Sequence, residues 1–202
     1  ETEFSGYERL VDASTHVEAI LKGSKLGEQR LQAGEDGTII LYSTPFYAEQ
    51  GGQIGDVGYL TTEGGGKIEV SGSQKPLDKI YFHDINFTAF PLKTGMRVKA
   101  RVFSEVRYRT ACNHTAAHIV NAALRQVFGD NTRQAGSDVD PVKFRFDYTA
   151  AKTPAAEEIL KVETISNAAI AAGYKVFKME RPLADAGKFG AGDHLRRGEA
   201  AT

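Results

Sequence analysis

Hydrophobic and polar positions follow two different periodicities along the chain. Between about residue 15 and residue 103, short segments rich in β-branched and aromatic residues are separated by turn residues, with no helix-length pattern between them. This spacing favours a small β-barrel or sandwich. The segment "EGGGK" (Glu63–Lys67) has the composition of a hairpin turn. We predict strands at Thr38–Phe46, Val57–Thr62, Lys67–Gly72, Lys79–Ile85 and Arg97–Phe103.

Beyond residue 104 the hydrophobic period becomes helical. Asn113 can cap a helix that runs to Phe128, and Gly129 can end it in the left-handed backbone conformation. We therefore expect a helix over residues 113–128. Its predicted apolar stripe consists of Ala116, Ile119, Val120, Ala123, Leu124 and Val127.

The remaining segments alternate between strand and helix patterns. "VKFRFDY" (Val142–Tyr148) alternates apolar and polar residues without a fault and predicts a half-buried strand. Thr153-Pro154 opens a second helix, which Gly173 ends, and "YKVFKME" (Tyr174–Glu180) is a further predicted strand. The buried side of the second helix is expected to include Ile159, Val162, Ile165 and Ala169.

The order of these elements predicts an α+β fold. We expect a small N-terminal β-barrel at residues 1–103. A two-layer α/β domain should follow at residues 104–202, with two helices packed on an antiparallel sheet. The boundary is expected near residues 103–110.

Composition narrows the class of protein and the cellular compartment that we expect. The chain has 202 residues, of which 41% are hydrophobic and 25% charged, as in ordinary globular proteins. No apolar run reaches membrane-span length, no signal peptide is present, and the missing first methionine suggests a fragment. The single cysteine, Cys112, suits a reducing cytosol, so we expect a cytoplasmic protein with no membrane partner. Because the net charge is −1, any nucleic-acid site must be a local patch.

Two histidines one helical turn apart are the first candidate for chemistry. His114 and His118 occupy positions i and i+4 of the predicted helix, so both point from one face. Such a pair can supply half of a tetrahedral zinc site, and it can equally be two polar residues on a solvated face. It is not a metalloprotease motif, because Thr115 stands where a general-base glutamate is needed. Asp193 and His194 could fold back as ligands, although a surface tail is the simpler interpretation.

A glycine-rich stretch is the second candidate. "TPFYAEQGGQIGDVG" (Thr44–Gly58) contains four glycines, which permit positive φ and close approach of the backbone to a ligand. A β-bulge or tight hairpin explains the same composition. The spacing fits neither a P-loop nor a dinucleotide fingerprint.

Together, these stretches resemble a known family. "TPFYAEQGGQIGDVG", "NHTAAHIVNAALRQVFG" and "QAGSDVDPVKFRFDY" are similar to the editing region of alanyl-tRNA synthetases, and "FSGYERL" is similar to the sequence that leads into it. The resemblance implies a β-barrel followed by an α/β domain. It also implies hydrolysis of serine or glycine wrongly esterified to tRNA(Ala), with the tRNA acceptor end and the rest of the parent chain as partners.

The resemblance also assigns site residues. It implies zinc held by His114 and His118 together with a later CxxxH segment, which is absent here although Pro182–Ala191 resembles the stretch before it. A non-catalytic fragment that binds the acceptor end is therefore the alternative. The family pattern assigns catalytic roles to Gln134, Ser137 and Gln53, and substrate binding to Thr44, Glu49, Gly51, Gly52, Asp56 and Arg145, with Gln50 in the same glycine-rich motif and Asp147 in the "RFD" segment.

A basic cluster is the last candidate. Arg97, Lys99 and Arg101 alternate along one predicted strand, and Arg107 and Arg109 follow soon after. Alternation places the first three on one face, where they could contact RNA phosphates. A solvated barrel face accounts for the pattern equally simply.

Overall fold

The computed structural model describes residues 1–23, 25–150 and 152–176. The chain divides into two compact units, which are described separately. The first comprises Glu1–Gln50 and Ile54–Arg109, and the second comprises Gly51–Gln53 and the chain from Thr110 onward. Three residues from the middle of the glycine-rich stretch thus belong to the second unit.

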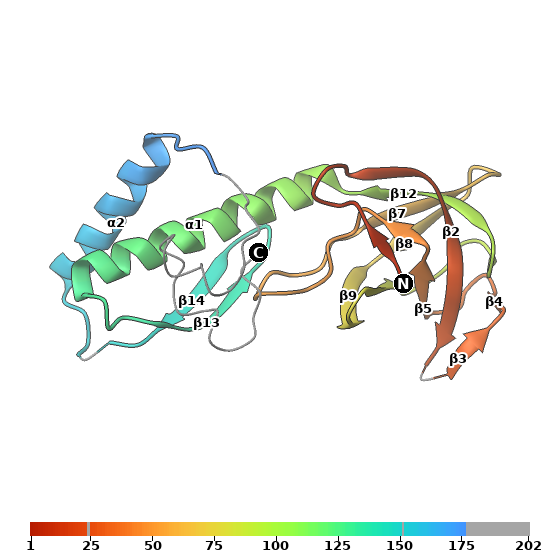
Figure 1. Cartoon of the computed structure of the whole chain (residues 1–202), viewed down its shortest axis with the longest axis horizontal. Coiled ribbons are helices and arrows are strands. Elements are labelled where there is room, and N and C mark those ends of the chain that lie inside the picture. The colour runs from red at the N-terminus through yellow and green to blue at the C-terminus, as the bar shows by residue number, and fades with distance from the viewer. Residues whose placement is uncertain (24, 151, 177–202) are drawn as a thin grey trace. The chain divides into compact units, whose positions relative to one another are not determined.

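The first unit is built on one antiparallel sheet that curls into a nearly closed barrel (Figure 1). Its strand order is β8-β7-β12-β2-β5-β10-β9, and β3 pairs with β2 beside this path. The strands are β2 (Val11–Lys22), β3 (Lys25–Glu28), β5 (Gly37–Leu41), β7 (Gly58–Thr62), β8 (Lys67–Val70), β9 (Gly72–Leu77), β10 (Ile80–Ile85) and β12 (Arg97–Val102).

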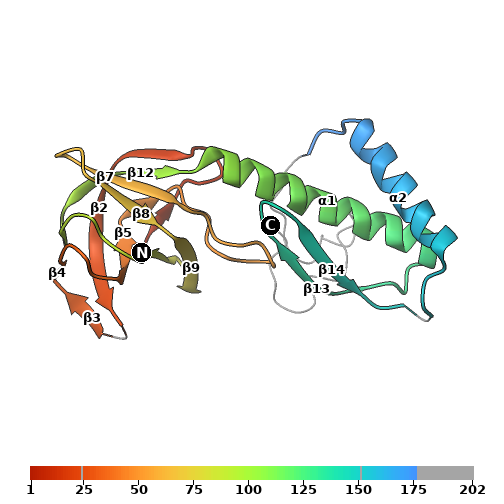
Figure 2. The ribbon, with the colours of Figure 1, turned by 180° about the vertical axis from the view of Figure 1, so that it is seen from behind.

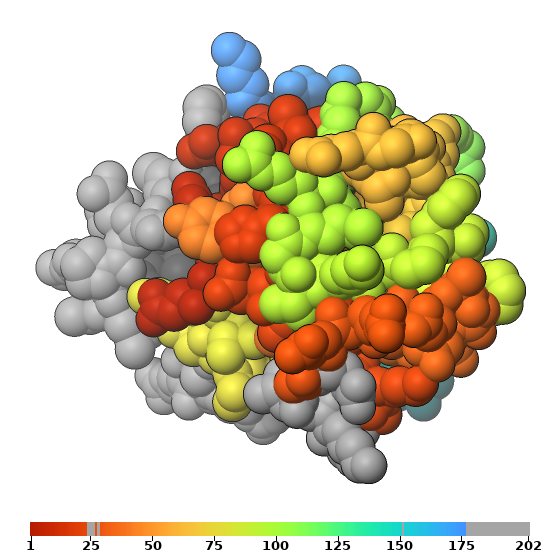
Figure 3. Space-filling view, turned by 90° about the vertical axis from the view of Figure 1, so that its right-hand side faces the viewer, coloured from red at the N-terminus to blue at the C-terminus, as the bar shows by residue number. Residues whose placement is uncertain are grey.

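Two short strand pairs complete this unit. β1 (Glu3–Phe4) runs parallel to β6 (Ser43–Thr44), and β4 (Arg30–Leu31) runs antiparallel to β11 (Leu92–Lys93). Figure 3 shows the surface over the second pair, where the orange-red segment around β4 lies beside the yellow-green segment around β11. These pairs join segments far apart in the sequence.

Alternating side chains form the barrel core. In β12, Val98, Ala100 and Val102 are buried, while the residues between them face outward. The same two-residue period fills the interior from β5, β8 and β10, as expected when one face of a sheet is buried. The fourteen buried members are Val17, Ile20, Leu31, Ile39, Leu41, Phe46, Leu60, Ile68, Val70, Ile85, Leu92, Val98, Ala100 and Val102.

The second unit combines helices with a two-stranded antiparallel sheet (Figure 2). Its elements are α1 (Ser104–Phe128), which begins in the first unit, β13 (Gln134–Val139), β14 (Phe144–Tyr148) and α2 (Ala156–Ala171). Ala123 and Leu124 of α1 are buried with Val162 of α2, and Phe146 and Tyr148 of β14 pack against them. The α+β prediction, with a barrel followed by helices on an antiparallel sheet, is confirmed.

Several local predictions are confirmed. The hairpin turn at Glu63–Lys67 joins β7 to β8, and Gly129 has φ of 90° directly after α1. β14 alternates half-buried and exposed residues as its sequence predicts. Gly173, with φ of 61°, follows α2.

The start of the first helix was predicted too late. α1 begins at Ser104 and not at Asn113, whose amide instead donates to the Asp140 carbonyl at 2.8 Å. Ser104 and Glu105 suit a helix start, because serine favours caps and an acidic group favours the first turn. The first two turns carry charged residues without an apolar stripe, so periodicity alone does not reveal them.

Other predicted positions differ at the ends of elements. Val142 lies outside β14 and is exposed, because the Asp140 carboxylate accepts hydrogen bonds from the backbone N–H groups of Val142 and Lys143 in a turn. Ile159 is exposed near the start of α2. Tyr174–Val176 form no strand, and the rest of that prediction lies outside the described residues.

Three strands of the barrel sheet were missed, and one predicted strand is split. β2, β3 and β9 were not predicted, and the predicted strand at 38–46 is divided at Tyr42 into β5 and β6. β2 changes its pairing partner along its length and contains bulges, so its inward positions do not keep a strict two-residue period. No helix among the described residues is long and apolar enough to cross a membrane.

Candidate functional site

The two histidines lie together on α1. Their rings are stacked, with centroids 5.0 Å apart and an interplanar angle of 14°. This follows from their spacing of four residues, which places side chains one above the other on a helix. His114 is half-buried and His118 is exposed, so one ring faces the unit while the other meets solvent.

Gln53, from the glycine-rich stretch, holds the half-buried histidine. Its side-chain Oε1 lies 2.6 Å from Nδ1 of His114. A carbonyl oxygen can only accept, so Nδ1 carries the proton and donates it, leaving Nε2 as the nitrogen with a lone pair. Burial lowers the pKa of His114 below its usual range, and electrostatic repulsion from the neighbouring His118 ring lowers it further. The neutral imidazole is therefore the favoured form near neutral pH.

Close backbone contact fixes the position of Gln53. The N–H of Val139 donates to the Gly52 carbonyl at 2.7 Å, and Gln53 forms an isolated parallel bridge with Val139. A Cβ on Gly52 would stand 2.4 Å from Oγ of Ser137 and 2.5 Å from its carbonyl oxygen. Gly52 also has φ of 77°, a conformation that side chains disfavour. Only glycine allows the loop to approach β13 this closely, and this contact buries Gln53.

Gln134 and Ser137 are also brought into this region. Both lie on β13, and Nε2 of Gln134 donates to Oγ of Ser137 at 3.0 Å. Both side chains are half-buried. A register shift between Gln134 and Gly136 allows two residues three apart in sequence to share a side of the strand. The structure thus pairs Gln53 with His114 and Gln134 with Ser137, and the close approach of Gly52 to Ser137 brings the two pairs into one region.

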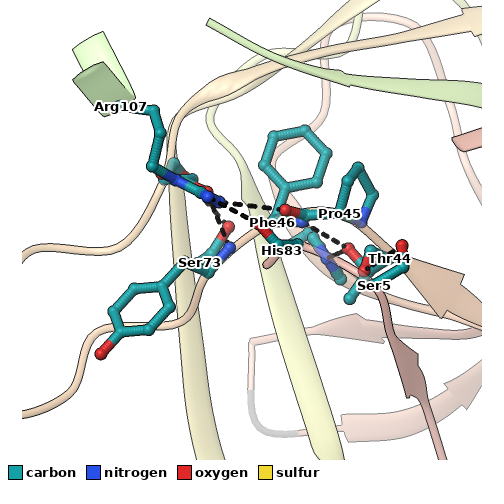
Figure 4. A network of polar contacts seen from close by, with 10 residues as sticks. Ser5, Thr44, Pro45, Phe46, Ser73, His83 and Arg107 are labelled. Atoms are coloured by element: carbon teal, nitrogen blue, oxygen red, sulfur yellow. Dashed lines mark hydrogen bonds and ion pairs between the residues drawn. The ribbon is translucent and has the colours of Figure 1, made fainter. Parts of the chain in front are cut away.

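Thr44 and Asp56 lie instead in buried networks of the first unit. Figure 4 shows Thr44 beside His83, and it shows the Arg107 side chain. The Thr44 hydroxyl lies 2.7 Å from Nε2 of His83, whose Nδ1 lies 3.2 Å from the Ile39 carbonyl. Because a carbonyl only accepts, Nδ1 of His83 is protonated and the Thr44 hydroxyl donates to Nε2. Burial lowers the pKa of His83 to about 4.

Asp56 is paired with Arg107. Nε of Arg107 donates to both carboxylate oxygens at 2.8 and 3.0 Å, and its Nη2 also contacts the carboxylate. The same guanidinium donates to the carbonyls of Gly6 and Pro45, while the N–H of Tyr47 donates to Asp56. Arg107 is therefore a structural residue and not a free member of the basic cluster. Sequence reasoning missed this pairing and also His83, although alternation with Ile85 places His83 inward.

The other assigned residues lie nearer the surface. Glu49 is exposed, and its backbone N–H donates to the Ser73 carbonyl at 2.8 Å. Gly51 has φ of 61° with open space where a Cβ would stand. Arg145 is exposed, and its Nε lies 3.3 Å from the carboxylate of Asp147. That ion pair runs along β14 and does not cross to the neighbouring strand.

The histidine pair supplies only part of a metal site. Among residues 1–23, 25–150 and 152–176, no three or more His, Cys, Asp or Glu side chains are grouped to hold a metal ion. Cys112 is exposed and unpaired to any other cysteine. His114 and His118 could contribute two of the four ligands that zinc usually takes, so further ligands would be required. Asp193 and His194 lie outside the described residues.

Comparison with known proteins places the chain in a family. A family model described as tRNA synthetases class II (A) matches residues 1–106. An alanine–tRNA ligase of Bradyrhizobium diazoefficiens is 42% identical over 166 residues, covering 82% of this chain and 18% of that protein. The alanine–tRNA ligase of Pelotomaculum thermopropionicum is 41% identical over 193 residues, covering 95% of the chain and 21% of that protein.

A third relative is matched over a similar share of its length. The alanine–tRNA ligase of Elusimicrobium minutum is 38% identical over 188 residues, covering 93% of this chain and 21% of that protein. The chain thus spans about a fifth of the length of these relatives. From the family match, we conclude that the chain belongs to the class II (A) tRNA synthetases, and it is similar to part of several alanine–tRNA ligases.

Proposed function

We propose that this chain is the editing region of an alanine–tRNA ligase, which removes serine or glycine wrongly attached to tRNA(Ala). The observation that carries the proposal is the contact between Gln53 and His114, which joins the two stretches resembling editing regions. The relatives are named for ligation, and the chain matches only about a fifth of their length. A distinct second activity in that part of a ligase is consistent with both facts.

A physical need for such an activity exists. A pocket shaped for alanine rejects glycine, which is smaller, and serine, which adds one hydroxyl, by only about 1–3 kcal/mol each. A second, hydrolytic site increases the discrimination. The reaction adds water to the ester carbonyl carbon and breaks the bond to the tRNA ribose oxygen, which releases the free amino acid. The site must favour a hydroxyl over the methyl group of alanine.

Gln134 and Ser137 suit the recognition of that hydroxyl. In the absence of substrate they bond to each other, and each retains further donor or acceptor capacity. A serine side chain can join this pair, whereas an alanine methyl would leave polar groups without a partner at a cost of about 1–3 kcal/mol. In this proposal both residues bind substrate, and Gln53 positions His114.

The proposal includes a metal at the histidine pair. His114, with its Nε2 lone pair kept available by Gln53, and His118 would hold zinc together with ligands from outside the described residues. Zinc there would supply Lewis-acid polarisation of an ester carbonyl. Zinc, binding to the tRNA acceptor end and a cytoplasmic location all remain parts of this proposal.

The test measures release of serine from serine-charged tRNA(Ala) by the purified chain. We expect hydrolysis of the serine ester to be much faster than that of the alanine ester. The double variant His114→Ala/His118→Ala should lose at least about 10–100-fold, the usual cost of disturbing a metal site. Cys112→Ala is a matched control, because it changes an exposed residue of the same helix.

The results of this assay distinguish an editing enzyme from a module that only binds tRNA. Unchanged hydrolysis in the double histidine variant would remove the histidines from the mechanism. Retained tRNA binding without any hydrolysis by the wild-type chain would support the alternative, a module that binds the acceptor end without catalysis. Melting curves of each variant show whether a loss of activity reflects loss of folding.

A further inference from the structure

The outer face of β12 carries a row of three cations. Arg97, Lys99 and Arg101 are all exposed, because the residues between them fill the barrel core. Alternate residues of a strand lie about 7 Å apart, so the row extends over about 13 Å. We name these three residues the β12 strip.

Neighbouring strands extend the positive surface. Lys99 is opposite Thr61 of β7, which is opposite Lys67 of β8. Lys67 is exposed, and its Nζ lies 4.9 Å from the centre of the Tyr59 ring. Across the same strands, Arg101 is opposite Tyr59 of β7, which is opposite Glu69 of β8. Glu69 places a carboxylate at one margin of this face. The cations therefore outnumber the acidic side chains across these three strands.

The side chains of the β12 strip make no ion pair or hydrogen bond within the described part of the chain. Several other cations of the first unit are paired with carboxylates, including Arg107 with Asp56 and Lys22 with Glu35. Within the part of the chain that the structure describes, neither a carboxylate nor any hydrogen-bond partner engages the β12 strip side chains. Three like charges on one strand repel one another, and a bound polyanion would relieve that repulsion.

Aromatic rings border the same face. Tyr59 lies opposite Arg101, and its ring centre is 5.9 Å from that of Phe103, which is 37% exposed. At the other end, Arg97 lies opposite His16, which stacks on the exposed ring of Tyr42 at 4.9 Å. A cationic track flanked by flat rings suits nucleic acid, since phosphates meet cations and bases stack on rings.

We propose that the β12 strip and its flanking rings form an RNA-docking surface. The identity of the RNA as tRNA rests on the proposed function, whereas the preference for a polyanion with stacking bases rests on the surface itself. An acidic peptide would satisfy the cations but would not use the rings. The surface lies wholly within the first unit, whereas the residues proposed for hydrolysis belong to the second.

The experiment measures binding of uncharged tRNA(Ala) transcript by fluorescence anisotropy at several salt concentrations. The strip variant is Arg97→Gln/Lys99→Gln/Arg101→Gln. The matched control, Lys22→Gln/Lys75→Gln/Lys93→Gln, removes the same charge from other strands of the same unit. We expect the strip variant to bind about tenfold or more weakly, with the slope of log affinity against log salt reduced by about 2, and the control to change little.

Three results would overturn the proposal. They are no tRNA binding by the wild-type chain, equal losses in both triple variants, and competition by polyglutamate as effective as competition by unlabelled RNA. Melting curves of both variants check that the barrel stays folded. Because the RNA is uncharged, binding is read without hydrolysis. Loss of the RNA-docking proposal in this binding assay would therefore not decide the editing proposal, which the hydrolysis assay tests. Absence of hydrolysis would likewise not change the binding result.

Discussion

The two units use their polar residues in different ways. In the first, Thr44 and Asp56 are buried and fully engaged by His83 and Arg107. In the second, His114 and the Gln134–Ser137 pair are only partly buried and keep free bonding capacity. The barrel has a core of fourteen buried apolar residues, whereas three are buried in the corresponding cluster of the second unit. Thr44 and Asp56 are thus held by the fold of the barrel, whereas His114, Gln134 and Ser137 remain able to bind a ligand.

The difference shows why a shared motif does not imply a shared role. Thr44, Gln53 and Asp56 stand in one glycine-rich stretch, yet only Gln53 belongs to the second unit. The flanking residues anchor the stretch in the barrel. Of the middle residues, Gln53 contacts His114 through its side-chain amide. Substitutions in this stretch should therefore separate into effects on barrel stability and effects on the site.

The largest expected effect comes from breaking the Asp56–Arg107 pair. Asp56→Asn should destabilise the first unit by about 3–5 kcal/mol, because it leaves a largely buried guanidinium without its counter-charge. Glu105→Gln, which breaks the exposed pair with Arg109, should cost less than about 1 kcal/mol. Urea unfolding of both variants measures the contrast. Equal small losses would show that the buried network does not hold the barrel.

Acid should weaken the barrel through His83. Its pKa is about 4 when folded and near 6.5 when unfolded. Between these values the unfolded chain binds a proton that the folded chain does not, so stability is full above pH 6.5 and falls as pH falls towards 4. The loss amounts to about 3 kcal/mol.

The measurement is urea unfolding across that pH window for the wild type and His83→Gln. The glutamine amide retains a donor and an acceptor but does not titrate. The difference between the two proteins isolates His83 from carboxylates that titrate at lower pH. Parallel pH profiles would contradict the assignment.

Gly52→Ala should disturb the second unit more than Gly51→Ala. Both glycines have positive φ, so both substitutions carry backbone strain of about 1–2 kcal/mol. Only Gly52 would place a Cβ against Ser137, whereas Gly51 faces open space. Hydrogen exchange at the Val139 amide, which donates to Gly52, should become faster in Gly52→Ala alone. Equal exchange in both variants would indicate that the close contact does not hold the loop.

The smallest expected effect concerns the proton on His114. Gln53→Leu removes the acceptor of Nδ1–H and should cost about 1 kcal/mol while allowing the proton to move to Nε2. Nitrogen chemical shifts of the imidazole report which nitrogen is protonated. Gln29→Leu, at an exposed position of the first unit, is the control. A wild-type ring protonated on Nε2 would refute the proposed positioning role of Gln53.

Much of the fold could be predicted because local patterns agree with it. The alternation of β12 and β14 and the glycines at 129 and 173 were all visible in the sequence. β2 could not be found in this way, since bulges and changing partners disrupt its alternation. The start of α1 was hidden because Arg107 faces Asp56, a partner 51 residues away.

The site could be predicted only in part. A spacing of four places His114 above His118 on any helix, so their stacking follows from local geometry. The contacts of Gly52 with Ser137 and of Gln53 with His114 join residues more than 60 positions apart. Such pairings depend on the tertiary path of the chain, and family resemblance suggested them without specifying any contact.

The assignment of Gly51–Gln53 to the second unit has a practical consequence for dissecting the chain. A cut at the predicted boundary between residues 103 and 104 looks natural, since a strand ends and a helix begins there. The C-terminal piece would then retain both histidines and β13 while losing the segment that closes against them. Engineered halves of this protein should therefore be supplied together, or the missing tripeptide should be grafted back with its flanking anchor.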